Sequence, residues 1–164
     1  MISETMQKAL NDQLNLELYS AYVYGSMAAH FEYKNLSGFA NWMQIQVQEE
    51  LGHSGKFFKY LTDAGGKVVL QAIAQPPTEF ASPLAALEEA YKHETKVTKA
   101  IHELMSLARK ENDYATEVFL QWFVTEQVEE EATAEKIVAK LRMIGDSTNG
   151  LFMMDHELGK RKAE

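Results

Sequence analysis

A glutamate and a histidine three residues apart, Glu50 and His53, lie inside a stretch with the apolar periodicity of a helix. Residues at this spacing share one helix face, so both side chains point the same way. Steps of four and three from this pair reach Leu36, Phe39 and Phe57, so the face packs against other helices. A carboxylate inside such a bundle is costly unless it is paired or binds a metal.

Three further helical stretches each carry one carboxylate in an otherwise apolar seam, at Glu17, Glu94 and Glu130. No Lys or Arg lies in the seams at these levels to neutralise them, so together with His53 they predict a metal centre. Facing helices of a bundle can hold two ions with one carboxylate bridging them. We expect Glu50 to be the bridge, with one ion held by Glu17, Glu50 and His53 and the other by Glu50, Glu94 and Glu130, near Gln127.

The donor types narrow the choice of metal without deciding it. The chain has no cysteine, so only oxygen and nitrogen ligands are available, and these suit ferrous iron, manganese or zinc. Tyr24 favours iron, because it lies two turns after Glu17 on the same seam and could hydrogen-bond to a ligand or donate an electron. Trp122 flanks the fourth seam. Tyr24 and Trp122 are also what an ordinary core would contain.

Further glutamates, Glu49, Glu126 and Glu129, lie one residue from the expected ligands. Glu126 and Glu129 make a dense acidic cluster with Glu130 and Glu131. This cluster predicts either an additional, more polar metal site beside the first two or a solvated acidic face.

The elements that must position these residues are long helices. We predict helices over residues 1–31, 37–64, 82–110 and 114–143 and a short fifth helix over 151–160. Ser3, Ser37 and Ser82 are the expected N-caps, with Pro83 following at the first helical position. Gly65 and Gly66 end the second helix.

Residues 67–81 lose the helical period and contain Pro76 and Pro77, which indicates an extended connection. Its length could span a whole helix, which makes the second and third helices parallel. The prediction is therefore an all-α, single-domain four-helix bundle over residues 1–164, with a long crossover between helices two and three and a short C-terminal fifth helix. Gly52 and Gly55 interrupt the second helix, and close approach to a neighbouring helix or subunit would explain them.

Composition excludes several classes of partner. The formal net charge of -8, from 24 acidic and 16 basic residues, argues against nucleic acid and favours small cations. No apolar run approaches the roughly 20 residues of a membrane span, and the N-terminus lacks the pattern of a signal peptide. We expect a cytoplasmic protein.

Four segments together resemble the bacterial non-haem ferritins along nearly the whole chain. They are the runs at 13–20 (QLNLELYS), 48–53 (QEELGH), 91–94 (YKHE) and 122–130 (WFVTEQVEE). The resemblance implies a ferroxidase centre that oxidises ferrous iron with dioxygen or peroxide, with two irons in each bundle. It also implies a third iron site made by Glu49, Glu126, Glu129 and Glu130, and storage of ferric mineral in a hollow shell of twenty-four subunits.

Two departures from the haem-containing relatives argue against haem. Leu51 stands where those relatives have methionine, and their second Glu-x-x-His is Gln127-x-x-Glu130 here. Two alternatives stay open at this point. One is a dimeric di-iron oxidase or peroxide scavenger that stores nothing, and the other is a structural module that binds a static ion such as zinc.

Overall fold

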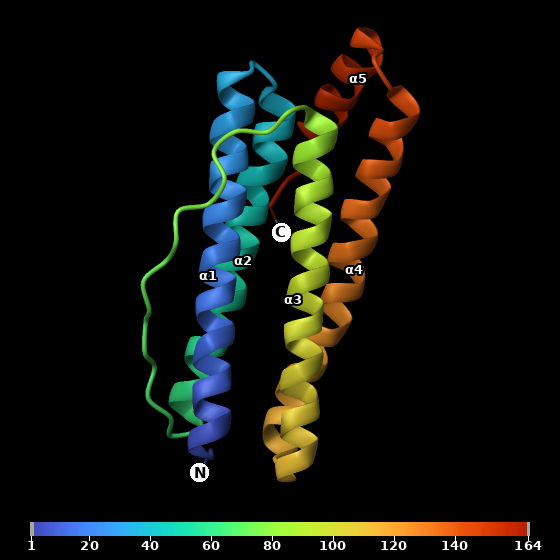
Figure 1. The fold of residues 1–164 in the computed structure, drawn as a ribbon. Coiled ribbons are helices and arrows are strands. Elements are labelled where there is room, and N and C mark those ends of the chain that lie inside the picture. The colour runs from blue at the N-terminus through green and yellow to red at the C-terminus, as the bar shows by residue number, and fades with distance from the viewer. Residues whose placement is uncertain (1, 164) are drawn as a thin grey trace.

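The computed structural model describes residues 2–163, and every regular element in that range is a helix. Four long helices form a bundle, and a short fifth helix packs across one end of it (Figure 1). The helices are α1 (Glu4–Tyr33), α2 (Ser37–Asp63), α3 (Pro83–Glu111), α4 (Tyr114–Ile144) and α5 (Thr148–Leu158). The predicted fold class, an all-α four-helix bundle with a fifth helix, is confirmed.

The ends of α1 follow local capping rules. The Ser3 side chain accepts a hydrogen bond from the backbone N–H of Met6, as predicted for an N-cap. Met1, where we expected the helix to begin, lies outside the described residues. The helix continues to Tyr33, two residues beyond the predicted end, and Asn35 then turns the chain with a φ of 57°.

The start of α2 differs from the prediction. Ser37 is the first helical residue, and Leu36 occupies the N-cap position without a capping side chain. The carboxylate of Asp155 in α5 accepts hydrogen bonds from the backbone N–H groups of Gly38 and Phe39 instead. The cap thus comes from a distant part of the chain, which local sequence signals do not indicate. The helix ends at Asp63, and Gly65 follows with a φ of 75°, as expected of a glycine stop.

The crossover over residues 67–81 is extended and runs along the outside of α1 (Figure 1). Asn11 and Asn15 of α1 hold it through both ends of their amides, which bond to the crossover backbone at Lys67, Val69 and Gln71 over 2.7 to 3.1 Å. The crossover returns the chain to the end where α2 begins, so α2 and α3 run parallel, as predicted.

The remaining helix boundaries are close to those predicted. Ser82 caps α3 with Pro83 as its first residue, and Asn112 ends it with a φ of 57°. The start of α5 is Thr148, three residues before the predicted one, because Ser147 accepts a hydrogen bond from the N–H of Gly150 and caps the helix there.

The core consists of two apolar clusters separated by a polar layer. One cluster contains Phe31, Phe39 and Leu141, and the other contains Leu10 and Phe57. Along each long helix, the inward glutamates fall between residues of the first cluster and residues of the second. The two clusters therefore enclose the polar layer from both ends.

Gly52 and Gly55 of α2 lie on the surface. These glycines are not explained by close approach of a neighbouring helix, because a methyl group on either would meet no other part of residues 2–163 within 4 Å beyond its own stretch of helix. Close approach of another subunit stays a prediction.

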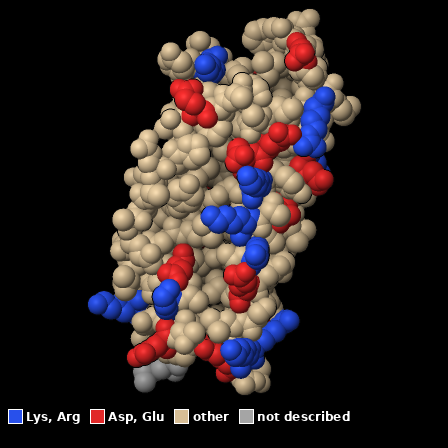
Figure 2. Space-filling model, in the orientation of Figure 1, with Lys and Arg blue, Asp and Glu red and all other residues tan. Residues whose placement is uncertain are grey.

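Basic and acidic side chains intermingle on the face seen in Figure 2. Among the described residues, no helix combines the length and apolarity that crossing a membrane requires.

Candidate metal centre

The polar layer contains all five residues that we predicted as principal metal ligands. Glu17 comes from α1, Glu50 and His53 from α2, Glu94 from α3 and Glu130 from α4. All five are buried, with Glu17, Glu50 and Glu94 each only 1% exposed. Their helical spacing turns each side chain inward at the same level of the bundle, so the long helices converge on a single acidic centre.

The first predicted ion group is assembled in the structure. His53 Nδ1 lies 3.2 Å from Glu50 Oε2 and 4.0 Å from Glu17 Oε2. One ligand atom from each of the three residues lies within 4.8 Å of the other two. Ligand atoms about 2.1 Å from one ion lie within about 4.2 Å of each other, so this group is close to coordination size.

Glu17 supplies the observation that tests whether a cation fits here. Its Oε1 accepts a hydrogen bond of 2.8 Å from Gln13 Nε2, but its Oε2 is buried without any hydrogen-bond partner. Among residues 2–163 it is the one buried side-chain polar atom in this condition. An unsatisfied buried acceptor costs about 1–3 kcal/mol, and a cation between Glu17 and Glu50 would satisfy it.

The second predicted group is arranged differently. Glu50, Glu94 and Glu130 do not each place a ligand atom within 4.8 Å of the other two. His53, Glu126 and Glu130 do. Glu94 is instead bound by the Tyr24 hydroxyl and by Gln127 Nε2, the latter at 3.2 Å. Carboxylates repel one another, so each takes the nearest protein donor.

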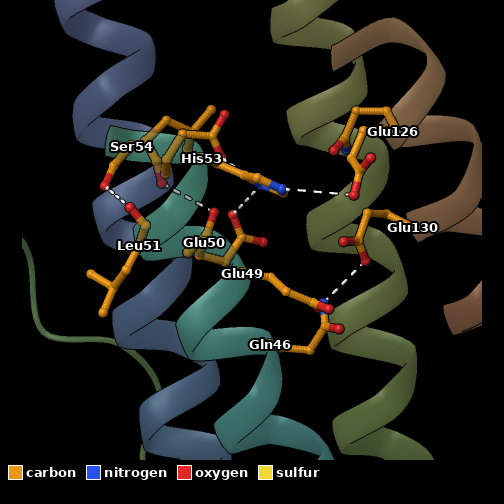
Figure 3. A network of polar contacts seen from close by, with 12 residues as sticks. Gln46, Glu49, Glu50, Leu51, His53, Ser54, Glu126 and Glu130 are labelled. Atoms are coloured by element: carbon orange, nitrogen blue, oxygen red, sulfur yellow. Dashed lines mark hydrogen bonds and ion pairs between the residues drawn. The ribbon is translucent and has the colours of Figure 1, made fainter. Parts of the chain in front are cut away.

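Gln46 and Glu126 complete this side of the centre. Gln46 Nε2 donates to Glu130 Oε2 over 3.1 Å, and His53 Nε2 lies 3.9 Å from Glu126 Oε1. Figure 3 shows the His53 ring directed at Glu126 and the Gln46 amide directed at Glu130. The sequence pattern did not single out Gln46.

Burial and mutual repulsion keep protons in the centre. Burial, followed by repulsion from Glu50, raises the pKa of Glu17 well above its usual value. Burial, with Glu94 as the next cause, does the same to the pKa of Glu50 and raises the pKa of Glu130 to about 7. A cation would favour the charged carboxylates, so its binding would release protons.

Aromatic groups surround the layer. The Tyr24 ring, fully buried, lies 6.4 Å from those of both Trp42 and His93, measured between centroids. His93 Nε2 lies 2.7 Å from Ser20 Oγ, and burial lowers the pKa of His93 to about 4, so its ring is neutral at neutral pH. Trp122, at the rim, is 5.5 Å from the His53 ring.

The residues expected for a third site are only partly brought together. Glu126 approaches His53, and Glu129 is exposed on α4. The Glu49 carboxylate is bound through both oxygens by Arg161, which follows α5, at 2.9 and 2.7 Å. Sequence analysis missed Arg161, and no local pattern marks it.

Four-helix bundles can build metal sites in their cores from side chains of facing helices, and the inward glutamates of this bundle have that arrangement. The chain matches the ferritin-like domain family over residues 7–144. It is 44% identical to a bacterial non-heme ferritin of Bacteroides fragilis (strain 638R) over 98% of this chain and 100% of that protein. It is 39% identical to one of Staphylococcus aureus (strain MRSA252), over 98% and 97% respectively.

The solved structures that this chain resembles are also ferritins. An open-pore ferritin from the archaeon Archaeoglobus fulgidus is 54% identical, with a TM-score of 0.98 over 99% of this chain and 100% of that chain. An engineered closed form of the same ferritin is 53% identical, with a TM-score of 0.99 over the full length of both chains. The chain belongs to the ferritin family.

Proposed function

We propose that this protein stores iron and is a ferroxidase. Ferrous ions are the substrate, and they bind at the centre between the four helices. The unpartnered Glu17 Oε2, facing Glu50 and His53, is the observation that supports this proposal most directly. Family membership adds independent support, since relatives of similar length are ferritins.

The residues have distinct proposed roles. Glu17, Glu50 and His53 bind the first ferrous ion, and Glu50, Glu94 and Glu130 bind the second, with Gln127 beside it. Each ferrous ion gives one electron to dioxygen. The carboxylates promote this loss because they stabilise the higher charge of ferric iron more than that of ferrous iron. Tyr24 orients Glu94 through the hydrogen bond from its hydroxyl.

A third iron site is also part of the proposal. Its proposed ligands are Glu49, Glu126, Glu129 and Glu130, and support comes from Glu126 and Glu130, which with His53 bring one ligand atom each within 4.8 Å of one another. These acids would receive iron that leaves the first two positions. No haem is expected, since Leu51 stands where haem-containing relatives have methionine.

The stored mineral needs an enclosed volume, which one bundle does not supply, so we propose a homo-oligomeric shell, with twenty-four subunits as the expected number. Apolar side chains support contacts between copies: Met143, Phe152 and Met153 are 62% to 87% exposed near α5, and Tyr22 and Leu51 are exposed over α1 and α2. Residues 1–164 would act as one domain, and a cytoplasmic location stays a prediction from the sequence.

The proposal is tested by anaerobic loading of metal-free protein with ferrous iron, followed by rapid mixing with dioxygen. We expect a fast phase near two irons per subunit and slower uptake afterwards. Glu50→Ala should slow the fast phase strongly, whereas Glu88→Gln, at a half-buried glutamate of α3 paired with Arg142, should leave it intact. Wild-type kinetics in Glu50→Ala would contradict the assignment.

The size of the assembly and the fate of the iron separate this proposal from its alternatives. A dimer with a fast phase and no continued uptake would indicate a di-iron oxidase. Metal binding without oxygen consumption would indicate a static site.

A further inference from the structure

The C-terminal tail after α5 brings a positive charge to the edge of the metal centre. Arg161 Nη2 donates to both carboxylate oxygens of Glu49, at 2.9 and 2.7 Å, and Arg161 Nη1 donates to Gln46 Oε1 at 2.5 Å. The guanidinium lies over the Trp42 ring, 4.8 Å from its centroid. Arg161 and Glu49 side chains are only about a quarter exposed, at 24% and 28%.

The tail is fixed in place by the packing of α5 against α2. Asp155 caps α2 through the N–H groups of Gly38 and Phe39, and Asn41 Nδ2 donates to the Arg161 carbonyl at 3.2 Å. A methyl group on Gly38 would lie 1.7 Å from the Asp155 carbonyl oxygen, so the two helices meet as closely as glycine allows. From there the tail turns back towards the middle of the bundle (Figure 1).

Arg161 affects two groups at the centre. Because Gln46 Oε1 accepts from Arg161, Gln46 Nε2 is left to donate to Glu130, so Arg161 sets the orientation of the Gln46 amide. The guanidinium also occupies both oxygens of Glu49, which are the atoms that a metal ion would need. Each oxygen keeps a second lone pair, but the positive guanidinium beside it repels an approaching cation, so the two compete for the Glu49 carboxylate.

We propose that Arg161 is an internal counter-cation for Glu49, so that a cation at the third site competes with the guanidinium for that carboxylate. This inference rests on the proposed function, because it concerns the acids that would receive a third metal ion. It does not involve Glu17, so binding of the first ion does not depend on this competition.

The test is calorimetric titration of the metal-free assembled protein with Zn²⁺, which binds oxygen and nitrogen ligands but does not change oxidation state. Arg161→Ala should strengthen the weaker, third binding event about twofold to fivefold, in keeping with loss of a partly exposed ion pair. Arg161→Lys keeps the charge and should stay near wild type. Arg142→Ala, which removes an equivalent charge from a surface pair with Glu88, should change nothing.

Two more variants make the result specific. Arg161→Gln keeps a polar side chain without the charge, so it should also strengthen zinc binding at the third site. If Arg161→Ala loosens α5, the result for Arg161→Gln is the one that tests the inference. In a Glu49→Gln background, Arg161→Gln should have no further effect. Circular dichroism and the size of the assembly check that each variant keeps its fold.

An unchanged or weaker third event in both Arg161→Ala and Arg161→Gln, or no third event in any variant, would overturn the inference while leaving the first two positions intact. Failure of the proposed function gives a different result. In that case the wild-type protein loaded with ferrous iron would show no fast oxidation phase on mixing with dioxygen, whatever the zinc titration gives.

Discussion

Tyr24 of α1 donates a hydrogen bond from its hydroxyl to Glu94 of α3, and this bond joins the first pair of helices to the second inside the core. Glu94 also accepts from Gln127 of α4. Three helices are thus connected through a single carboxylate that we propose as a metal ligand. These two hydrogen bonds hold the Glu94 carboxylate in place in the metal-free protein.

Removal of the Tyr24 hydroxyl should weaken this connection. We expect Tyr24→Phe to lower the free energy of unfolding of the metal-free protein by about 1–2 kcal/mol, the scale of a buried hydrogen bond. The number of zinc ions bound should not change, because every ligand remains. Urea unfolding and metal counting check both statements. Tyr33→Phe, on the same helix but exposed, is the matched control.

Glu17→Gln should separate stability from metal binding. A neutral amide removes a buried acid whose Oε2 has no partner, and its N–H₂ can donate to Glu50. We expect the metal-free protein to gain about 1–3 kcal/mol in free energy of unfolding and to bind metal more weakly. Glu32→Gln, exposed on the same helix, should do neither. A less stable variant with wild-type affinity would argue against the role of Glu17.

The stability of the metal-free protein should depend on pH through Glu130. Its pKa rises from 4.5 to about 7 on folding, mainly because burial disfavours the charged form. The folded protein keeps this proton where the unfolded chain has lost it, so the stabilisation is complete below about pH 4.5 and is lost as the pH rises through about 7. The change corresponds to about 3 kcal/mol.

Urea unfolding of the metal-free protein across this pH range measures the effect. Glu130→Gln should show a shallower fall in stability, with the remaining slope coming from Glu17, Glu50 and Glu94, whose pKa values are raised in the same direction. An identical slope in the variant would show that Glu130 does not titrate in this way.

The cap that α5 provides to α2 should be measurable. Asp155→Ala leaves the N–H groups of Gly38 and Phe39 without their acceptor and should lower the free energy of unfolding by about 1 kcal/mol. Asp155→Asn retains an acceptor oxygen and should lose less. Limited proteolysis should cut the C-terminal segment faster in Asp155→Ala. Equal cleavage rates in wild type and variant would mean that the cap does not hold α5.

Much of this centre could be predicted from the sequence because helical periodicity is local. Glu17, Glu50, Glu94 and Glu130 stand out as acids in apolar seams, and a period of 3.6 residues turns each of them inward. Ser82 followed by Pro83 marked the start of α3, and the length of the segment 67–81 indicated the crossover. Each of these signals lies within one helix or one loop.

Other features were decided only by the tertiary structure. Asp155 meets Gly38 across 117 residues and Arg161 meets Glu49 across 112, so neither contact leaves a local pattern. The second group of ligand atoms also depends on packing, because buried carboxylates that repel one another take whichever donor the neighbouring helix offers. Spacing along one helix therefore determined which acids face inward, and the docking of separate helices decided which partner each acid has.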